Sequence, residues 1–287
     1  MHRFLKGISV FFVLAVLGSC ASTDSPAPAA VAAPPVVEAA PPAPVFVDIR
    51  TWKVLGVDTA YSDGVLSSVS RFEYDAAGNM LKEEQFSGAK VLLGLKTYNY
   101  KTPENVEIVT FDGKGEILGK AVRVLSGDRI VKETLTNAKN EIQSTEEYTY
   151  DAQGQKTRWS VKTASGSQVS SEYVWDQGRL VRISVLDAGG AVIKRFERTY
   201  DAGGLLTAEE EYDAKGELAG SIAYIREGAV LVREERRTPT GAVLSSVQLT
   251  NDAEGNPVNM KYLDRSGRVI ETKTQTGKTF TRTVQVK

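Results

Sequence analysis

Paired glutamates are the residues of this chain whose type and spacing come nearest to a catalytic arrangement. They occur at Glu83–Glu84, Glu146–Glu147, Glu209–Glu211 and Glu234–Glu235. Two carboxyl groups about 5 to 9 Å apart carry out glycoside hydrolysis in many enzymes. Neighbouring residues of a β-strand point to opposite faces, however, so consecutive glutamates are poorly placed to share one site. We interpret these clusters as solvated strand faces with cross-strand ion pairs, and predict no catalytic residues.

Other catalytic and metal chemistry is excluded by what the composition lacks. The chain has one histidine, His2, and one cysteine, Cys20. His2 lies in the N-terminal segment that we predict below to be a cleaved signal peptide, so the mature chain should have no histidine. This rules out a Ser-His-Asp triad, a histidine–cysteine zinc site and, with a lone cysteine, thiol–disulfide exchange. Aspartates recur at turn positions, but most turns supply one carboxylate, whereas calcium sites need several. We expect no metal, no cofactor and no enzymatic activity.

Charge and hydrophobicity are those of an ordinary globular protein. Of the 287 residues, 41% are hydrophobic and 25% are charged, and 35 Lys and Arg nearly balance 36 Asp and Glu. A basic excess that would attract nucleic acid or an anionic lipid surface is absent. We expect no nucleic-acid partner.

The first nineteen residues have the pattern of an export signal. Arg3 and Lys6 precede the apolar run Ile8–Leu17. This run of ten residues is too short for a membrane-spanning helix, which needs about 20, so we predict a signal peptide over residues 1–19. The sequence Leu17-Gly18-Ser19-Cys20 resembles the lipobox of bacterial lipoproteins. That resemblance implies a lipidated Cys20 at the mature N-terminus and a partner membrane held through this anchor.

Two further features bear on the anchor. Acyl chains contribute about 0.8 kcal/mol per buried methylene, so two or three chains hold a protein on a bilayer. Ala21 and Ser22 resemble the sorting signal for the outer membrane, which implies an exported protein of the bacterial cell envelope. In the alternative interpretation Cys20 is incidental and the protein is secreted without lipid.

A proline-rich tether follows over residues 20–49. Residues 21–46 contain seven of the ten prolines of the chain and almost no charge. Such a segment cannot form a packed core and favours extended, polyproline-like backbone. We predict a solvated spacer between the anchor and a folded domain over residues 50–287.

The remaining sequence repeats a short unit that ends in a turn. Glycines recur at intervals of mostly ten to fourteen residues from Gly64 to Gly277, and Asn105 and Asn140 fill the two wide gaps. The fullest turns read Tyr-Asp-x-x-Gly, at residues 74–78, 150–154, 200–204 and 212–216. The aspartate can accept hydrogen bonds from turn amides, and glycine adopts the left-handed conformation that ends such a turn. About eight residues rich in Val, Ile, Thr, Tyr and Phe separate the turns, enough for one strand each.

This spacing predicts an all-β fold, an antiparallel β-meander of repeated β-hairpins with about nineteen strands. The turns also repeat over about 50 residues, which indicates duplication of a four-strand unit. Alternation places Trp159 with Val161, and Val181 with Ile183 and Val185, on one face. The pattern leaves open whether the sheet stays open or curled, folds into a sandwich or closes into a barrel. We predict that the last strand, residues 278–287, lies at a sheet edge.

The Tyr-Asp-x-x-Gly hairpins resemble the YD repeats of RHS-type proteins, and the intervals near twelve resemble the half-repeats of MORN-type sheets and their antitoxin-like bacterial relatives. The resemblance covers residues 60 to 280 and implies the architecture of a repeat protein. RHS proteins enclose a toxin with far longer arrays, so it does not imply encapsulation.

These observations favour a lipid-anchored envelope protein that binds or scaffolds an unknown protein or glycan through a repeated β-sheet surface. The tyrosines before the turn aspartates could form an exposed aromatic row for such a ligand, or could be cross-strand packing residues. A carboxylate-dependent enzyme acting on envelope polysaccharide is one alternative. An immunity protein for an exported toxin, as the antitoxin-like resemblance implies, is the other.

Overall fold

The structure, a computed structural model, describes residues 45–286. The chain divides into two units, Met1–Ala43 and Pro44–Lys287, and only the second is described here. The predicted signal peptide, the lipidation site Cys20 and the tether up to residue 44 lie outside the described residues. The first strand begins at Val45, within the segment that the sequence analysis assigned to the tether.

The described residues form eighteen β-strands. The first nine are β1 (Val45–Tyr61), β2 (Leu66–Tyr74), β3 (Met80–Ser87), β4 (Leu92–Thr102), β5 (Asn105–Asp112), β6 (Ile117–Ser126), β7 (Arg129–Asn137), β8 (Ile142–Tyr150) and β9 (Lys156–Thr163). The others are β10 (Gln168–Asp176), β11 (Arg179–Leu186), β12 (Val192–Tyr200), β13 (Leu206–Asp213), β14 (Leu218–Glu227), β15 (Val230–Arg237), β16 (Val243–Asn251), β17 (Pro257–Asp264) and β18 (Val269–Val286).

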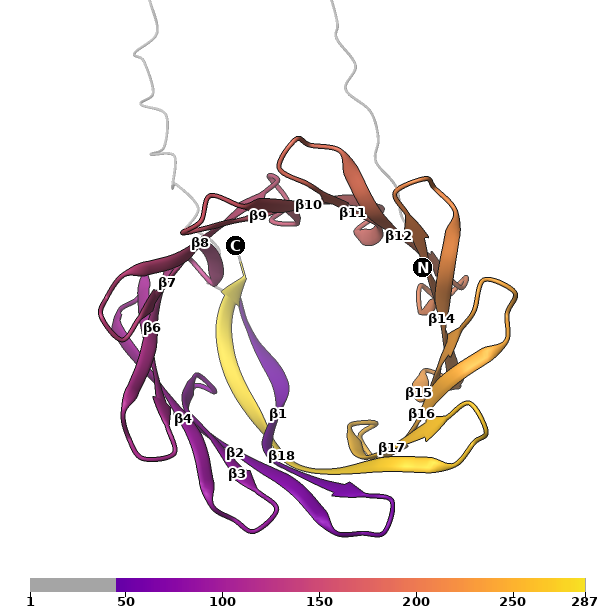
Figure 1. The fold of residues 1–287 in the computed structure, drawn as a ribbon, viewed down its shortest axis with the longest axis horizontal. Helices are drawn as coiled ribbons and strands as arrows, with labels where there is room; N and C mark the ends of the chain where they lie inside the picture. The colour runs from indigo at the N-terminus through magenta and orange to yellow at the C-terminus, as the bar shows by residue number, and fades with distance from the viewer. Residues whose placement is uncertain (1–44, 287) are drawn as a thin grey trace, which may run out of the picture. The chain divides into compact units, whose positions relative to one another are not determined.

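Each strand pairs antiparallel with the next one along the chain, and β1 pairs with β18. The meander therefore closes into the barrel of Figure 1. This confirms the predicted all-β antiparallel meander and decides among the forms that the sequence left open. No helix of the described residues is long and apolar enough to cross a membrane.

Residues 278–286 pair only with β1 and so have one free edge, as predicted, but they are the end of β18 and not a separate last strand. Gly277 is not a turn glycine but lies inside β18, where its backbone pairs with Val54. A Cβ at this position would collide with the indole of Trp52, so glycine serves close packing here. Because β18 continues through this point, the barrel has eighteen strands instead of nineteen, and β18 closes the sheet.

The turns are built as predicted. In the β2–β3 turn, Asp75 Oδ1 accepts hydrogen bonds from the amides of Ala77 (2.9 Å) and Asn79 (2.8 Å), and Gly78 has a positive φ of 82°. The same arrangement recurs at Asp213 and Asp252. Asn140 also has a positive φ, as expected of a residue that replaces glycine, whereas the wide gap around Asn105 contains a tight β4–β5 turn. These turns keep neighbouring strands in antiparallel register.

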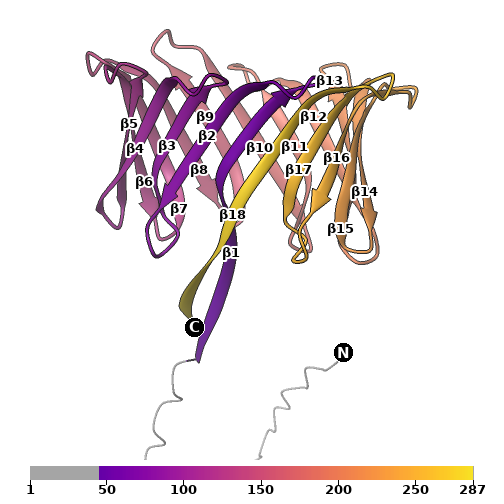
Figure 2. The same cartoon turned by 90° about the horizontal axis from the view of Figure 1, so that it is seen from below.

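The barrel has two different rims. Turns that follow odd-numbered strands form one, here called the far rim. Turns that follow even-numbered strands form the other, the ribbon rim, from which β1 and β18 continue as a two-stranded ribbon (Figure 2). Residues 45–54 and 277–286 of this ribbon pair only with each other. The ribbon contacts the ribbon rim through the ion pair of Arg282 with Asp128 (2.8 Å) and through Phe280, whose ring lies 5.6 Å from that of Tyr74.

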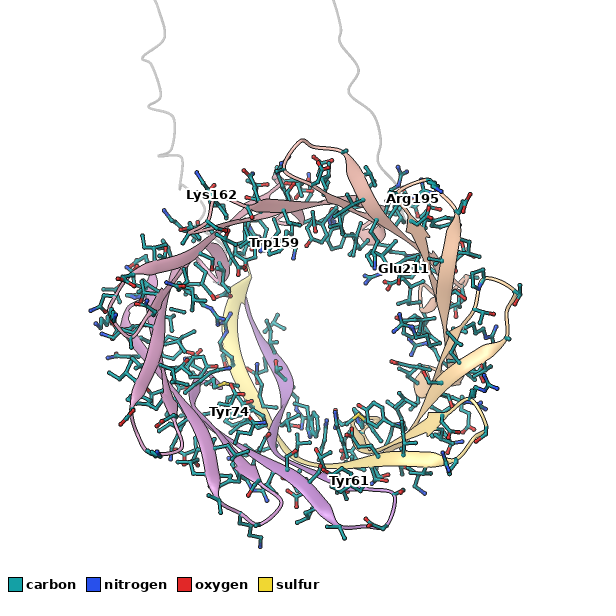
Figure 3. All side chains as sticks on the ribbon, in the orientation of Figure 1. Tyr61, Tyr74, Trp159, Lys162, Arg195 and Glu211 are labelled. Carbon is teal, nitrogen blue, oxygen red and sulfur yellow. The ribbon has the colours of Figure 1, made fainter. Side chains whose placement is uncertain are left out.

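The barrel has little filled core. The main buried cluster consists of Val106, Ile108 and Ala121, with Tyr98 and Leu125 packed against it. Within the described residues, no large side chain is completely buried. Barrels of about 16 to 18 strands are too wide for side chains to fill. The side chains drawn in Figure 3 accordingly leave the middle of the ring open.

Candidate binding surface on the inner wall

Strand register decides which residues face the lumen. Figure 3 shows Trp159 of β9 and Glu211 of β13 directed inward, and Lys162 of β9 and Arg195 of β12 directed outward. Residues paired directly across two strands lie on the same face. The pairs Glu211–Phe196 and Trp159–Ser171, and those that follow around the barrel, therefore assign an inner and an outer wall without conflict.

A ring of large side chains lines the inner wall at one level, and we call it the luminal ring. Each even-numbered strand from β2 to β16 contributes one residue, and these residues recur every 25 or 26 positions. Most are half-buried aromatic residues. The members are Phe72, Tyr98, Arg123, Tyr148, Tyr173, Arg198, Tyr224 and Leu249.

The odd-numbered strands place a second set of side chains directly opposite the luminal ring. Four of these partners are carboxylates, and the others are apolar or aromatic. The pairs with carboxylates are Phe72–Glu83, Arg123–Glu133, Arg198–Glu209 and Tyr224–Glu234. Aromatic rings and charged side chains therefore stand next to each other around the inner wall.

The glutamate clusters divide between the two walls as the alternation predicts. Glu83, Glu146, Glu209, Glu211 and Glu234 face inward, while Glu84, Glu147, Glu210 and Glu235 face outward. Most of the inward carboxylates are held by a cation. The nitrogen–oxygen distances are 3.4 Å for Lys96–Glu83, 2.6 Å for Arg198–Glu209 and 2.6 Å for Lys194–Glu211.

Glu146 is held by aromatic donors instead of a cation, and Glu234 makes no ion pair with the described residues. Oε2 of Glu146 accepts hydrogen bonds from Tyr148 Oη (2.6 Å) and from Trp159 Nε1 (2.8 Å). Burial, and then the hydrogen bond to Glu146, raises the pKa of Tyr148. Its phenol therefore remains a donor at neutral pH, and one carboxylate fixes the orientation of two rings.

Burial also raises the pKa of other tyrosines of the inner wall. For Tyr98 the second cause is the charge of Glu83, and for Tyr224 it is the charges of Glu209 and Glu234. Burial likewise raises the pKa of Glu234. Desolvation disfavours charge, so burial favours the neutral forms of these inner-wall groups.

The outer wall is lined by charged pairs. Arg71 binds Asp58 (2.6 Å), Arg158 binds Glu172 (3.0 Å), and the side chains in both pairs are more than 40% exposed. Glu235 forms ion pairs with both Arg233 and Arg237, with nitrogen–oxygen distances of 2.8 Å and 2.6 Å. Exposed aliphatic side chains occur mainly where the even-numbered strands begin at the far rim. Examples are Leu93, Leu118, Ile193, Leu244 and Ile270.

Most of the tyrosines before the turn aspartates pack instead of forming an exposed row. Tyr150 Oη donates to the carbonyl of Ile130 (2.8 Å) and Tyr200 Oη to that of Leu180 (2.7 Å), twenty residues earlier in each case. Asn251 makes the same contact with Leu231 (3.0 Å). These bonds tie each strand to its neighbour at the ribbon rim. The packing interpretation is confirmed for Tyr150 and Tyr200, whereas Tyr212 lies on the outer wall and donates to Glu210 of its own strand.

Cofactor and metal ligands were not predicted from the sequence. Among the described residues, no group of three or more His, Cys, Asp or Glu side chains is placed to hold a metal ion. A hollow of about 290 Å³ lies on the inner wall over Gly220, lined by Phe196, Glu211, Ile222 and Arg236 among others. A Cβ on Gly220 would lie 2.9 Å from the carbonyl oxygen of Arg237, so this glycine also serves strand packing.

The luminal ring was not found by the sequence analysis. Its signal was present in the spacing of Tyr98, Tyr148, Tyr173 and Tyr224, which follows a period near 25 residues. The turns and the 50-residue period were predicted, whereas the side chains that recur inside the strands were not.

Comparison with known proteins adds little to these observations. No protein-family model matches the sequence, and no curated protein matches it. A porin-like protein from Bacteroides uniformis is similar to 78% of this chain over 98% of its own, at 14% identity and a TM-score of 0.46. A porin-like protein from Bacteroides vulgatus (78% and 97% coverage, 13% identity) has a TM-score of 0.34. TcdB2-TccC3 (74% and 18% coverage, 11% identity) has one of 0.28.

Proposed function

We propose that this protein is a lipid-anchored, non-enzymatic binding module of the bacterial cell envelope that takes its ligand against the inner wall of the barrel. The export signal, the lipobox-like sequence ending in Cys20 and the proline-rich spacer support the anchored location. The class of ligand, protein or glycan, is a separate question.

The contrast between the two walls carries the proposal. The aromatic side chains of the luminal ring gather on the inner wall, whereas exposed ion pairs such as Arg71–Asp58 and Arg158–Glu172 lie on the outer wall. Ligand sites combine apolar and aromatic surface with a few fixed polar groups. The inner wall has this composition, and its repeat positions present it around the whole circumference.

The outer wall also argues against a barrel embedded in lipid. Membrane-spanning barrels carry an apolar band on the outside, and Arg or Lys facing the bilayer midplane costs about 2 to 4 kcal/mol each. Here Arg71, Arg158 and Arg182 face outward near the middle of their strands. We therefore propose that the acyl anchor, and not the barrel, holds the protein on the membrane.

The inner carboxylates do not favour the enzymatic alternative. A glycosidase needs one carboxyl group as acid and a second as base or nucleophile. Glu83, Glu209 and Glu211 are each held by a cation, and Glu146 is held by two aromatic donors, so Glu234 has no second unpaired carboxylate of these clusters to act with. These contacts fix side chains of a wall, and they support binding over catalysis.

The anchor is tested by metabolic labelling with a palmitate analogue in cells that express the full chain. We expect label on the wild type, recovered with membranes, and none on a Cys20→Ala variant. An unlabelled wild type, or a labelled variant, would refute anchoring through Cys20.

The binding wall is tested by photo-crosslinking in cells. Leu135 faces the lumen and Val122 faces outward on the neighbouring strand, and their exposed fractions, 42% and 39%, are nearly equal. A benzophenone side chain at each position inserts into any nearby C–H bond, of protein or glycan. We expect adducts from position 135 and none from position 122. Adducts from position 122 alone, or from neither, would overturn the proposal.

A further inference from the structure

We propose that the inner wall around Trp159 is a subsite for an uncharged saccharide. This inference rests on the proposed function of the inner wall as the ligand-binding surface and names the ligand class. The aromatic patch, as we call it, consists of Tyr148, Trp159 and Tyr173 with the polar residues Glu146 and Lys156.

The three rings come from three adjacent strands. Tyr148 of β8 lies directly opposite Trp159 of β9, which lies directly opposite Ser171 of β10. Tyr173 follows two residues after Ser171 and so lies on the same wall, diagonal to Trp159. Because Ser171 is small and buried, no large neighbour from β10 stands directly beside the indole. The patch therefore presents a broad aromatic surface to the lumen.

The rings are held with their polar edges against the wall. Both the Tyr148 hydroxyl and the Trp159 indole N–H donate to Oε2 of Glu146. Because these bonds fix the Tyr148 and Trp159 rings in advance, little side-chain entropy is lost when a ligand stacks on them. Glu146 Oε1 accepts no hydrogen bond from the described residues, so it remains available to a ligand hydroxyl.

The charges of the patch balance. Lys156 Nζ lies 4.3 Å from the ring centroid of Tyr173 and 5.9 Å from that of Tyr148, within the range of cation–π attraction. Its charge offsets that of Glu146. Glu133, directly opposite Glu146 on β7, is paired with Arg123. A patch without net charge selects against strongly acidic and strongly basic ligands.

This chemistry matches a sugar better than a polypeptide. A pyranose has a flat face of C–H groups that stacks on an aromatic ring and a rim of hydroxyls that both donate and accept hydrogen bonds. The patch offers ring faces, one acceptor at Glu146 and one ammonium donor at Lys156. Polypeptide anchors instead insert into closed, fully desolvated pockets. The patch lies on an open wall, where half-buried rings provide surface without enclosure.

The outer wall contains a matched control. Tyr212 Oη donates to Glu210 Oε2 (2.6 Å), and Arg195 lies 4.5 Å from the Tyr212 ring centroid. The tyrosine and glutamate have the same spacing and hydrogen bond as Tyr148 and Glu146, but they lie on the outside, and an arginine instead of a tryptophan stands opposite the tyrosine. Variants of this set test whether a tyrosine–glutamate pair alone is sufficient for binding.

The experiment is calorimetric titration of the full chain, purified in detergent, with chitohexaose, maltohexaose and, as a polypeptide probe, β-casein. We expect at least one hexasaccharide to bind and β-casein not to bind at the patch. Trp159→Ala and Glu146→Gln should each weaken binding about tenfold or more, and Trp159→Phe less than Trp159→Ala. Tyr212→Ala and Glu210→Gln should leave affinity within about twofold. Thermal unfolding of each variant establishes that it is folded.

Three results would overturn the saccharide assignment. These are no binding of either hexasaccharide, equal losses in the outer-wall controls, or binding of β-casein that depends on Trp159 while the saccharides fail. None of them affects crosslinking from position 135, which tests the inner wall itself. If crosslinking from position 135 fails, in contrast, the proposed binding at the inner wall is refuted, and not only the assignment of a saccharide ligand.

Discussion

Two tyrosine–glutamate pairs with the same spacing lie on opposite walls of the barrel. On the inner wall, Tyr148 donates to Glu146, which also accepts from Trp159, and burial is the largest cause of the raised pKa of Tyr148. On the outer wall, Tyr212 donates to Glu210, and this hydrogen bond is itself the largest cause of the raised pKa of Tyr212. The local motif is the same, and the environment differs.

The comparison shows what closure adds to a repeated hairpin. In an open sheet both faces meet bulk water, and only the alternation of side chains along each strand distinguishes them. Closing eighteen strands turns one face into a concave wall on which the side chains of neighbouring repeats converge. Aromatic rings then gather without filling a core, and charges on that wall lose part of their hydration. A binding surface therefore arises from the alternation of side chains along the strands together with closure of the barrel.

Removing closure should have the largest effect. A chain ending at Asp264 lacks β18, so β1 and β17 lose a partner and expose long edges. We expect loss of the soluble monomer and of a cooperative thermal transition. A chain ending at Gly277 keeps the pairs of β18 with β17 and with the barrel part of β1, and should remain monomeric. Light scattering after gel filtration compares the two. A monomeric, cooperatively folded chain without β18 would show that closure is dispensable.

Truncating a side chain on each wall should give the next largest difference. Ile108 is 5% exposed in the inner cluster, and Val122, on the outer wall of the neighbouring strand, is 39% exposed. Ile108→Ala should lower the free energy of unfolding by about 3 kcal/mol, and Val122→Ala by less than about 1 kcal/mol. Denaturant titration measures both. Equal losses would contradict the difference in burial between these two positions.

The turns and the strand spacing could be predicted because each depends on a few neighbouring residues. Asp75 and Gly78 define a turn within five positions, and Trp159 and Val161 share a face by strand geometry alone. Closure could not be predicted in the same way. It depends on β1 and β18, more than 200 residues apart, and the sequence analysis read Gly277 as a turn.

The same limit applies to the candidate site. Alternation along the strand puts Glu146 and Glu147 on opposite faces of the sheet, and this separation was predicted. The direction in which the whole sheet curls decides which of these two glutamates points into the lumen. The contact of Trp159 with Glu146 joins two neighbouring strands and depends on their register, which is displaced by a bulge at nearly every hairpin.

Removing only the tyrosine hydroxyls sharpens the comparison with a smaller effect. Tyr148→Phe leaves Glu146 half-buried with one donor fewer, and should cost about 1.5 kcal/mol. Tyr212→Phe removes an equally short bond, but solvent replaces it, and the cost should stay below about 0.5 kcal/mol. Unfolding free energies at neutral pH measure both. Equal costs would show that the inner wall is hydrated like the outer one.

The smallest expected effect concerns pH and separates the inner wall from the turns by its sign. Burial raises the pKa of Glu234 above 4.5, so ionisation opposes folding, and its cost appears as the pH rises from the unfolded to the folded pKa. Glu234→Gln should therefore stabilise the barrel at neutral pH and not below pH 4.

Hydrogen bonds led by that of Ser266 lower the pKa of Asp264, a far-rim turn residue, to about 2. Its contribution is present above the unfolded pKa near 3.8 and is lost on acidification, so Asp264→Asn should destabilise at neutral pH and converge with wild type near pH 2. Thermal midpoints from pH 2 to 8 test both signs, and a Glu234→Gln variant less stable than wild type at pH 7 would contradict a desolvated inner wall.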